Sequence, residues 1–332
     1  MKKILSTKTN CPVCNSKKIT FLMNGKDRVH AIKGEYTLWN CTNCLLIFLN
    51  PQPSPKILEK HYPRDYHAYN GYETGSKKEK FAIFLYKLYF SAEQNGVSAF
   101  IQKIIFLPFR HLLRGTYIKQ RLKILDVGCG SGEFLYKMKK CGLDAYGVEP
   151  SKEGTDAAKK MGLNVRCGFL ENQKFPSDYF DVITLNHVFE HVSDPLKTLK
   201  ELGRILKKDG KLIMAFPNPD SLQFKIFREY WASLEVPRHL NIYYPKTIKY
   251  MASIGKFNIE SIRYISFPYG IQASLAYVFN KNEKPLDRTW IGKSRMLYFV
   301  IFPIVYILDF LHCGDAIEVT LTPKKTIKKF KP

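Results

Sequence analysis

Glycines and carboxylates with a fixed spacing lie in the middle of the 332-residue chain. The apolar pair Ile124-Leu125 predicts a buried strand, after which the backbone turns tightly into a helix beginning near Ser131. The glycines that allow this turn are Gly128, Gly130 and Gly132. About 20 residues later, Glu149 ends a second predicted strand, where its carboxylate can accept hydrogen bonds from both ribose hydroxyls of an adenosine. These residue types at this spacing indicate nucleoside binding.

The position of Asp126 distinguishes between two kinds of nucleotide. A dinucleotide-binding turn has the spacing Gly-x-Gly-x-x-Gly, which brings a pyrophosphate onto the N-terminus of a helix. This chain has Asp-x-Gly-x-Gly-x-Gly instead, and Asp126 would repel a pyrophosphate but can hold the ammonium group of a methionine. The pattern indicates S-adenosylmethionine as the cofactor and resembles motif I of class I methyltransferases. An ordinary strand-turn-helix is the alternative, and the agreement of glycines, carboxylates and strand order argues against it.

The segments after Glu149 alternate between predicted strands and helices. Strands are expected at 165–170, 182–186 and 211–216, and a helix at 196–206. Such alternation predicts an α/β fold with a parallel sheet whose ligands bind at the carboxyl ends of the strands. The resemblance implies a Rossmann-like seven-stranded methyltransferase sheet. Pro150, Phe169 and Asn186 are then expected at the cofactor pocket.

Histidines surround the place where an acceptor would meet the cofactor. A hydroxyl loses its proton as it attacks a sulfonium methyl group, so a neutral imidazole is the expected base. The candidates are His187, His191 and His239, with Glu190 beside them. His239 is preferred as base or acceptor ligand, because it lies in a polar and aromatic stretch after the fifth strand, where acceptor-binding loops usually sit in this fold. A histidine that only orders this loop is the alternative.

The residues after Asn186 also bear on the kind of acceptor. Methyltransferases of amines often carry Asn/Asp-Pro-Pro-Tyr here, whereas this chain has Asn-His-Val-Phe-Glu-His, which favours transfer to oxygen or carbon. Some quinone-type O-methyltransferases hold a divalent ion through Glu-x-x-Glu-His. In this chain His187 occupies the first position of that pattern, which leaves Glu190 and His191 as two ligands and a weak metal site.

Two Cys-x2-Cys pairs lie near the N-terminus, with 26 residues between them. Their members are Cys11, Cys14, Cys41 and Cys44. The spacing is that of a zinc ribbon, in which four thiolates close a structural Zn²⁺ site. Disulfides are disfavoured because residues 1–8 have basic residues and no apolar signal core, which indicates a reducing cytoplasm. Iron with the same four ligands stays open.

An aromatic segment with Tyr62 and Tyr66 follows the cysteines. With this segment, nearly the whole chain resembles bacterial methyltransferases that have a four-cysteine head and a class I core and are often associated with surface polysaccharide or natural-product sugars. The resemblance implies methyl transfer to a hydroxyl or carbon of a sugar, glycolipid or other small molecule. Tyr62 and Tyr66 would lie over the acceptor, with Trp231 and Arg238 as further substrate-binding residues. Packing between head and core is the alternative for the tyrosines.

The chain is expected to have three parts. They are a zinc-ribbon head with the aromatic segment (1–72), a helical linker or lid (73–120), and the methyltransferase domain with a helical hairpin insertion at about 267–313 (121–332). The insertion includes an apolar run at 297–311, but Pro303 and Asp309 interrupt it and a membrane span needs about 20 apolar residues. Strands expected at 257–266 and 315–322 would pair antiparallel, which excludes a single crossing between them.

The charge of the chain is strongly positive, with 52 Lys and Arg against 29 Asp and Glu. Basic residues beside aromatic and aliphatic helices suit peripheral contact with the inner face of an anionic membrane and a lipid-linked sugar acceptor. A solvated basic surface with ordinary core helices is the alternative. RNA methylation is the rival function, since basic zinc-ribbon proteins often bind nucleic acid. Dispersed basic residues and the hydrophobic insertions argue against nucleic acid as the partner.

Overall fold

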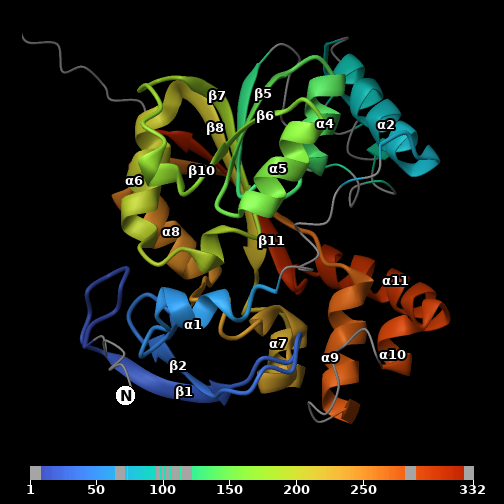
Figure 1. Cartoon of the computed structure of the whole chain (residues 1–332). Helices are drawn as coiled ribbons and strands as arrows, with labels where there is room; N and C mark the ends of the chain where they lie inside the picture. The colour runs from blue at the N-terminus through green and yellow to red at the C-terminus, as the bar shows by residue number, and fades with distance from the viewer. Residues whose placement is uncertain are drawn as a thin grey trace, which may run out of the picture.

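The computed structural model of the chain describes residues 9–63, 72, 74–94, 98, 101, 105–106, 109, 113, 122–280 and 289–324. Figure 1 shows a large sheet with helices on both faces in the upper part of the molecule and a smaller sheet below it. A group of helices from the C-terminal third of the chain lies to the right of the smaller sheet (Figure 1).

Seven strands form the larger sheet, in the order β10-β11-β8-β7-β4-β5-β6. Their bounds are β4 Lys123–Val127, β5 Asp144–Glu149, β6 Asn164–Cys167, β7 Phe180–Asn186, β8 Leu206–Pro217, β10 Phe257–Tyr264 and β11 Ala316–Pro323. β11 runs antiparallel to both of its neighbours, and the other pairs are parallel. This confirms the predicted α/β fold and its seven-stranded sheet. The strand order reverses beside β4, so the carboxyl ends of β4 and β7 border the crevice where such sheets bind ligands.

Helices cover both faces of this sheet (Figure 1). They are α2 Lys77–Gln94, α4 Glu133–Lys140, α5 Lys152–Lys160, α6 Pro195–Ile205 and α8 Pro245–Ile254, with the short 3₁₀ helices η3 Leu170–Asn172 and η4 Phe189–His191. α6 begins where predicted because Asp194 accepts a hydrogen bond from the Lys197 amide and proline is its first residue. Its buried face, with Leu199, Leu202 and Ile205, joins the main core.

The smaller sheet has four antiparallel strands in the order β1-β2-β3-β9. They are β1 Ile19–Gly25, β2 Tyr36–Cys41, β3 Ile47–Leu49 and β9 Asn241–Ile242, with helix α1 Pro55–Glu59 nearby. Three strands come from the N-terminal segment, whereas β9 comes from the chain between β8 and β10. This sheet is therefore shared between the predicted head and the predicted methyltransferase domain; the boundary at residue 72 stays a prediction.

The chain between β8 and β9 forms a run of short helices. These are α7 Leu222–Phe227, η5 Arg228–Tyr230 and η6 Ala232–Leu234. Trp231, Leu234 and Val236 pack with Leu38 and Leu49 in one apolar cluster. The stretch that was expected to be an acceptor loop is therefore also part of the core beneath the smaller sheet.

The hairpin insertion connects β10 to β11. It consists of α9 Pro268–Asn280, α10 Trp290–Lys293 and α11 Arg295–Phe310, with Pro303 inside α11. The strands on either side pair antiparallel, as predicted. Among the residues that the structure describes, no helix combines the length and apolar composition that a membrane span requires.

Candidate active site

The glycine turn follows β4 at the centre of the large sheet. Gly128 has a φ of 69°, and a Cβ placed on it would lie 2.4 Å from Val188 Cγ2. Gly130 and Gly132 also have positive φ angles, of 54° and 88°. Gly132 is the N-cap of α4, close to the predicted helix start. The turn is therefore pressed against the segment that follows β7, and only glycine fits at Gly128.

Glu149 lies at the end of β5, and its carboxylate holds the glycine turn. One oxygen accepts a hydrogen bond from the Gly130 amide and the other from the Ser151 amide, each at 2.8 Å. Burial raises the pKa of Glu149, and these amide hydrogen bonds oppose the rise. Each carboxylate oxygen has a second lone pair, so the group can still accept hydrogen bonds from ribose hydroxyls.

Asp126 is buried in β4, two residues before the turn. Its Oδ1 atom accepts a 2.6 Å hydrogen bond from the hydroxyl of Thr184 on the neighbouring β7. This contact fixes the orientation of a carboxylate at the carboxyl end of the central strand. A fixed carboxylate beside a glycine turn fits an ammonium group, as the sequence predicts.

The remaining predicted cofactor residues lie at the ends of neighbouring strands. Pro150 directly follows β5, Asn186 is the last residue of β7, and Phe169 comes two residues after β6. Phe169 is 64% exposed, so its ring is accessible to a ligand. Phe169 follows β6, whose last residue pairs with Glu149 on β5, and this position suits stacking against an adenine ring. Together the residues present fit S-adenosylmethionine: a turn without side chains, two buried carboxylates and an exposed aromatic ring.

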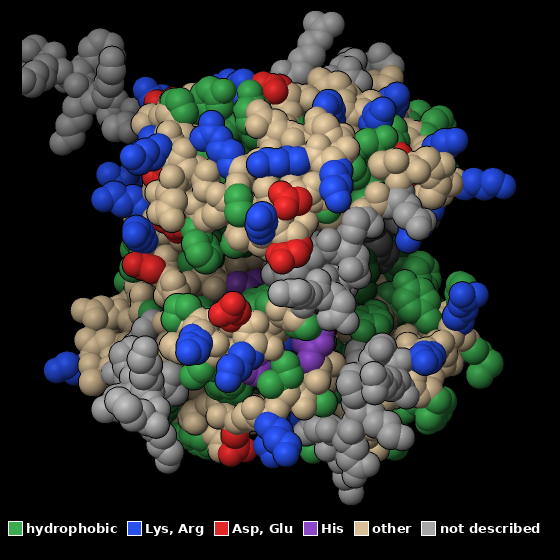
Figure 2. Space-filling model, in the orientation of Figure 1, with side chains coloured by type: hydrophobic (Ala, Val, Ile, Leu, Met, Phe, Trp, Pro, Cys, Tyr) green, Lys and Arg blue, Asp and Glu red, His purple; other side chains and the backbone are tan. Residues whose placement is uncertain are grey.

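The four candidate catalytic residues are brought together at the carboxyl end of β7. Glu190 is fully buried, and its Oε1 atom lies 3.2 Å from His187 Nδ1 and 3.8 Å from His239 Nε2. The rings of His191 and His239 meet edge to face, with centroids 4.7 Å apart. Figure 2 shows histidine side chains in the hollow between the upper and lower parts of the molecule.

His239 and Glu190 both favour the deprotonated state. Burial lowers the pKa of His239 to about 4, helped by the neighbouring His191. The ring is therefore neutral at physiological pH, and its Nδ1 atom donates to the Ser233 carbonyl at 2.9 Å. Burial alone would raise the pKa of Glu190, but the hydrogen bond with His187 and the nearby histidines lower it overall. Glu190 is therefore an ionised carboxylate that can orient a histidine ring.

The same cluster has the composition of a metal site. Ligand atoms of Glu190, His191 and His239 all lie within 4.8 Å of one another. Within the described part of the chain, Glu190 Oε2 is buried without a hydrogen-bond partner. The sequence offered only Glu190 and His191 as ligands, because His239 lies 48 positions further along the chain. The three residues can hold a divalent ion or pass a proton.

Tyr62 reaches the cluster from the N-terminal part of the chain. Its hydroxyl lies 2.9 Å from His191 Nδ1, an atom that also lies 3.0 Å from the Arg238 carbonyl. The aromatic segment thus contributes one side chain to the candidate site. Tyr66 lies outside the residues that the structure describes.

The other two predicted substrate-binding residues are interior. Trp231 is 1% exposed, and the centroid of its ring lies 5.1 Å from that of the Phe224 ring. Arg238 is equally buried, and its guanidinium pairs with Asp27 at 3.0 Å and with Glu235 at 3.2 Å. Both residues are buried beside the candidate site, where their contacts hold the surrounding chain in place. A direct role in substrate binding stays a prediction.

A buried polar network beneath the site was not predicted. Asp27 accepts hydrogen bonds from Arg238 and lies 2.6 Å from His61 Nδ1, and His61 Nε2 lies 2.8 Å from the Tyr36 hydroxyl. His61 adjoins Tyr62 in sequence, so the network connects the head to the residues around the histidine cluster. Asp27 and Arg238 are 211 positions apart, and no local pattern marks such a pair.

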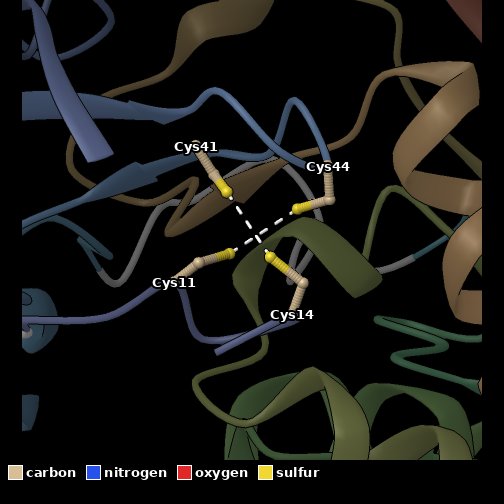
Figure 3. Close-up of side chains that lie close together, drawn as sticks. All are labelled: Cys11, Cys14, Cys41 and Cys44. Atoms are coloured by element: carbon tan, nitrogen blue, oxygen red, sulfur yellow. Dashed lines mark hydrogen bonds between the residues drawn. The ribbon is translucent and has the colours of Figure 1, made fainter. Parts of the chain in front are cut away.

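The four N-terminal cysteines converge on one point (Figure 3). The Cys11 and Cys44 sulfurs are 3.6 Å apart, and those of Cys14 and Cys41 are 3.5 Å apart. All four ligand atoms lie within 4.8 Å of one another, and three of the cysteines are buried. The donor set and its convergence fit a four-coordinate structural ion, for which zinc is the first choice.

A mixed sheet in this order, with a glycine turn after its central strand and a carboxylate ending the next, is the fold of class I methyltransferases. Residues 99–260 match the family model described as a methyltransferase domain. These residues therefore carry a methyltransferase domain with the class I fold, as the sequence predicts.

Individual proteins are also similar to parts of this chain. The chain is 35% identical over 123 residues to the ubiquinone biosynthesis O-methyltransferase of Actinobacillus pleuropneumoniae, a match that covers 32% of this chain and 53% of that protein. The protein with the same name from Coxiella burnetii is 32% identical over 117 residues, covering 32% of this chain and 50% of the relative. The chain thus spans about half the length of these curated relatives. Among solved structures, YcgJ of Bacillus subtilis has a TM-score of 0.44 at 19% identity, over 63% of this chain and 95% of that one.

Proposed function

We propose that the protein transfers a methyl group from S-adenosylmethionine to a hydroxyl, or to an acidic carbon, of a small acceptor such as a sugar or glycolipid. The observation that carries the proposal is the close approach of the glycine turn to Val188, which lies between the candidate residues His187 and Glu190. A cofactor held on the turn would meet an acceptor beside a histidine and a buried carboxylate, which is the arrangement that proton removal requires.

The cofactor would be held by residues from three strands. Asp126 would bind the ammonium group, Glu149 the ribose hydroxyls, and Phe169 the adenine ring, with the glycine turn beneath. Bound S-adenosylmethionine supplies an electrophilic methyl group on a sulfonium. The chain's own residues must then exclude water, orient the acceptor and remove its proton.

We propose His187 as the base and His239 as its neighbour that orders the site, which reverses the preference expected from sequence. The side chain of His187 is 38% exposed, whereas His239 is 4% exposed. His187 Nδ1 is oriented by the ionised Glu190, so Nε2 is the atom proposed to receive the proton. His239, with a pKa of about 4, is too weakly basic to hold a proton near neutral pH.

Two observations support a hydroxyl as the acceptor. The curated relatives are named as O-methyltransferases. A histidine oriented by a carboxylate, as proposed for His187 and Glu190, is also of the kind that deprotonates hydroxyl groups. A sugar or glycolipid rests on the resemblance of the whole chain, including its four-cysteine head, to polysaccharide-associated methyltransferases. RNA methylation is the alternative, supported by the net charge of +23 and by the four-cysteine head.

The experiment is a pair of measurements on the full chain: calorimetric titration with S-adenosylmethionine, and turnover with a panel of nucleotide sugars, glycolipids, catechols and RNA. His187→Gln and Glu190→Gln are expected to lower turnover by roughly 10²- to 10⁴-fold while leaving cofactor affinity within a few-fold. His30→Gln, on the loop between β1 and β2, is the matched control and keeps turnover.

Each result bears on a separate claim. Unchanged turnover in His187→Gln removes His187 from the role of base. Activity that appears only with RNA replaces the small acceptor with the alternative function. A wild-type chain that binds no S-adenosylmethionine contradicts the proposed function as a whole. A metal requirement is tested on the same samples: if chelation abolishes turnover and Mg²⁺ restores it, Glu190, His191 and His239 act as ligands.

A further inference from the structure

The helical hairpin exposes a continuous apolar face. On α11, exposed large apolar side chains recur at the spacing of one helical face: Met296, Phe299, Val300, Ile304, Ile307, Phe310 and Leu311. Phe310 is 82% exposed and Met296 is 78% exposed. The adjoining α9 and α10 add Phe279 at 72% and Trp290 at 77%. Figure 2 shows this hydrophobic surface at the lower right of the molecule.

Single exposed apolar residues are ordinary, but a whole helical face of them is not. The opposite face of α11 is buried through Ile301, Val305 and Leu308, so the helix already has its partner within the fold. The exposed face is therefore not the side that stabilises the hairpin. Its composition requires another explanation.

Within the three described helices of the hairpin, the acidic charge faces inward. Asp309 is the one acidic residue in α9, α10 and α11. It is 4% exposed, and its oxygens accept hydrogen bonds from the Ser266 amide at 3.0 Å and the Ser266 hydroxyl at 2.6 Å. Lys293 and Arg295, where α10 meets α11, are exposed. The outer face is therefore apolar with a basic margin.

This combination distinguishes between two occupants of the face. A second copy of the chain would bring a second set of basic residues, since each copy carries a net charge of +23. A bilayer with anionic headgroups attracts the basic margin and accepts the apolar side chains. α11 has 16 residues and is too short to span, which suits a helix lying in the plane of the interface.

The hairpin is joined to the edge of the sheet where ligands bind. The Asp315 amide donates to the Ser266 hydroxyl at 2.8 Å, and the Asp315 carbonyl accepts from the Asn218 amide at 2.8 Å, directly after β8. The base of the hairpin therefore sits at the carboxyl end of β8, beside β7 and the histidine cluster. Figure 1 shows the hairpin continuing from this edge.

We propose that the apolar face of α9, α10 and α11 docks onto the surface of an anionic bilayer, with α11 lying at the headgroup boundary. The basic margin is attracted to the lipid headgroups while the aromatic and aliphatic side chains enter the acyl region. The inference does not depend on the identity of the methyl acceptor. It places the protein on the bilayer through a hairpin whose base lies at the carboxyl end of β8.

The test is co-sedimentation of the full chain with vesicles of phosphatidylcholine, alone or mixed with phosphatidylglycerol. The wild type is expected to sediment with the anionic vesicles. Phe299→Gln/Phe310→Gln is expected to lower the partition coefficient by about tenfold per residue, because each loses a buried aromatic side chain at the interface. Lys293→Gln/Arg295→Gln is expected to reduce binding to the anionic vesicles only.

A matched control separates this face from exposed apolar residues in general. Phe21→Gln/Ile254→Gln changes two exposed apolar residues on β1 and α8, which lie away from the hairpin in Figure 1, and is expected to leave binding unchanged. The proposal is overturned if Phe299→Gln/Phe310→Gln binds vesicles as the wild type does. It is also overturned if the wild type ignores vesicles and light scattering finds a dimer that this variant makes monomeric, since a second copy would then cover the face.

Discussion

At the scale of single residues, His239 couples the site to pH. The pKa of an unperturbed histidine is about 6.5, and burial lowers that of His239 to about 4. Between these values the unfolded chain binds a proton that the folded chain does not. The contribution of the neutral His239 to the free energy of unfolding is therefore complete above pH 6.5 and is lost as the pH falls toward 4.

Replacing His239 with Gln removes this dependence. The free energy of unfolding of the wild type, minus that of the variant, is expected to increase by at most about 3 kcal/mol between pH 4 and pH 6.5. Urea unfolding at several pH values measures it. Parallel stability curves for the two proteins would contradict the assignment of a buried, neutral His239.

The free energy of unfolding has to be compared between the wild type and His239→Gln, because the buried Asp315 changes the stability of both proteins with pH in the opposite direction. Burial raises the pKa of Asp315 from 3.8 to about 6. The folded chain then holds a proton that the unfolded chain releases, so this contribution is present below pH 3.8 and is lost as the pH rises through 6. In the wild type alone the two trends partly cancel between pH 4 and 6.

At the scale of elements, the glycine turn after β4 has little tolerance for change. Gly128→Ala would place a Cβ 2.4 Å from Val188 at a φ of 69°. We expect a loss of roughly 2–3 kcal/mol in the free energy of unfolding, together with much weaker binding of S-adenosylmethionine. Calorimetry and urea unfolding of the same sample measure both effects.

Gly142 offers a matched control for that substitution. Its φ is 87°, but a Cβ there meets nothing within 4 Å. Gly142→Ala is expected to cost roughly 1 kcal/mol through backbone strain alone and to leave cofactor affinity unchanged. If both variants bind the cofactor equally, close packing against Val188 is not what shapes the pocket.

The elements of the large sheet could be predicted because their signals are local. Apolar runs and helical spacing indicated its strands and the helix now found at Pro195–Ile205, and the glycine turn located the cofactor site. β9 has only two residues, and no periodicity can reveal a strand that short. The three histidines could be identified as candidates, but their meeting around Glu190 depends on how the chain returns after β8.

At the scale of the whole molecule, the four-cysteine site is continuous with the methyltransferase core. Cys11, Cys41 and Cys44 belong to the same apolar cluster as Leu199 and Met251. The Cys44 carbonyl also accepts a 2.7 Å hydrogen bond from Thr247 at the start of α8. Loss of a bound ion is therefore expected to destabilise the methyltransferase core as well as the N-terminal head.

Removing the metal is accordingly expected to lower turnover more than cofactor affinity. Metal analysis of the purified chain should find about one zinc ion per molecule. Cys44→Ser should lose the ion and lower the melting temperature, with turnover falling further than S-adenosylmethionine binding. Cys167→Ser changes an exposed cysteine outside the cluster and should alter none of these quantities. Iron in place of zinc, or full turnover in the metal-free protein, would contradict this prediction.

The pairing of β3 with β9 has a consequence for how such chains can be recombined. Ile47 and Phe48 pair with Ile242 and Asn241, residues that lie on the far side of five core strands in sequence. A head exchanged between homologous chains at residue 72 alone would therefore arrive without its fourth strand. A functional chimera has to take residues 231–242 from the same parent as the head, so that two distant segments of the gene are inherited together.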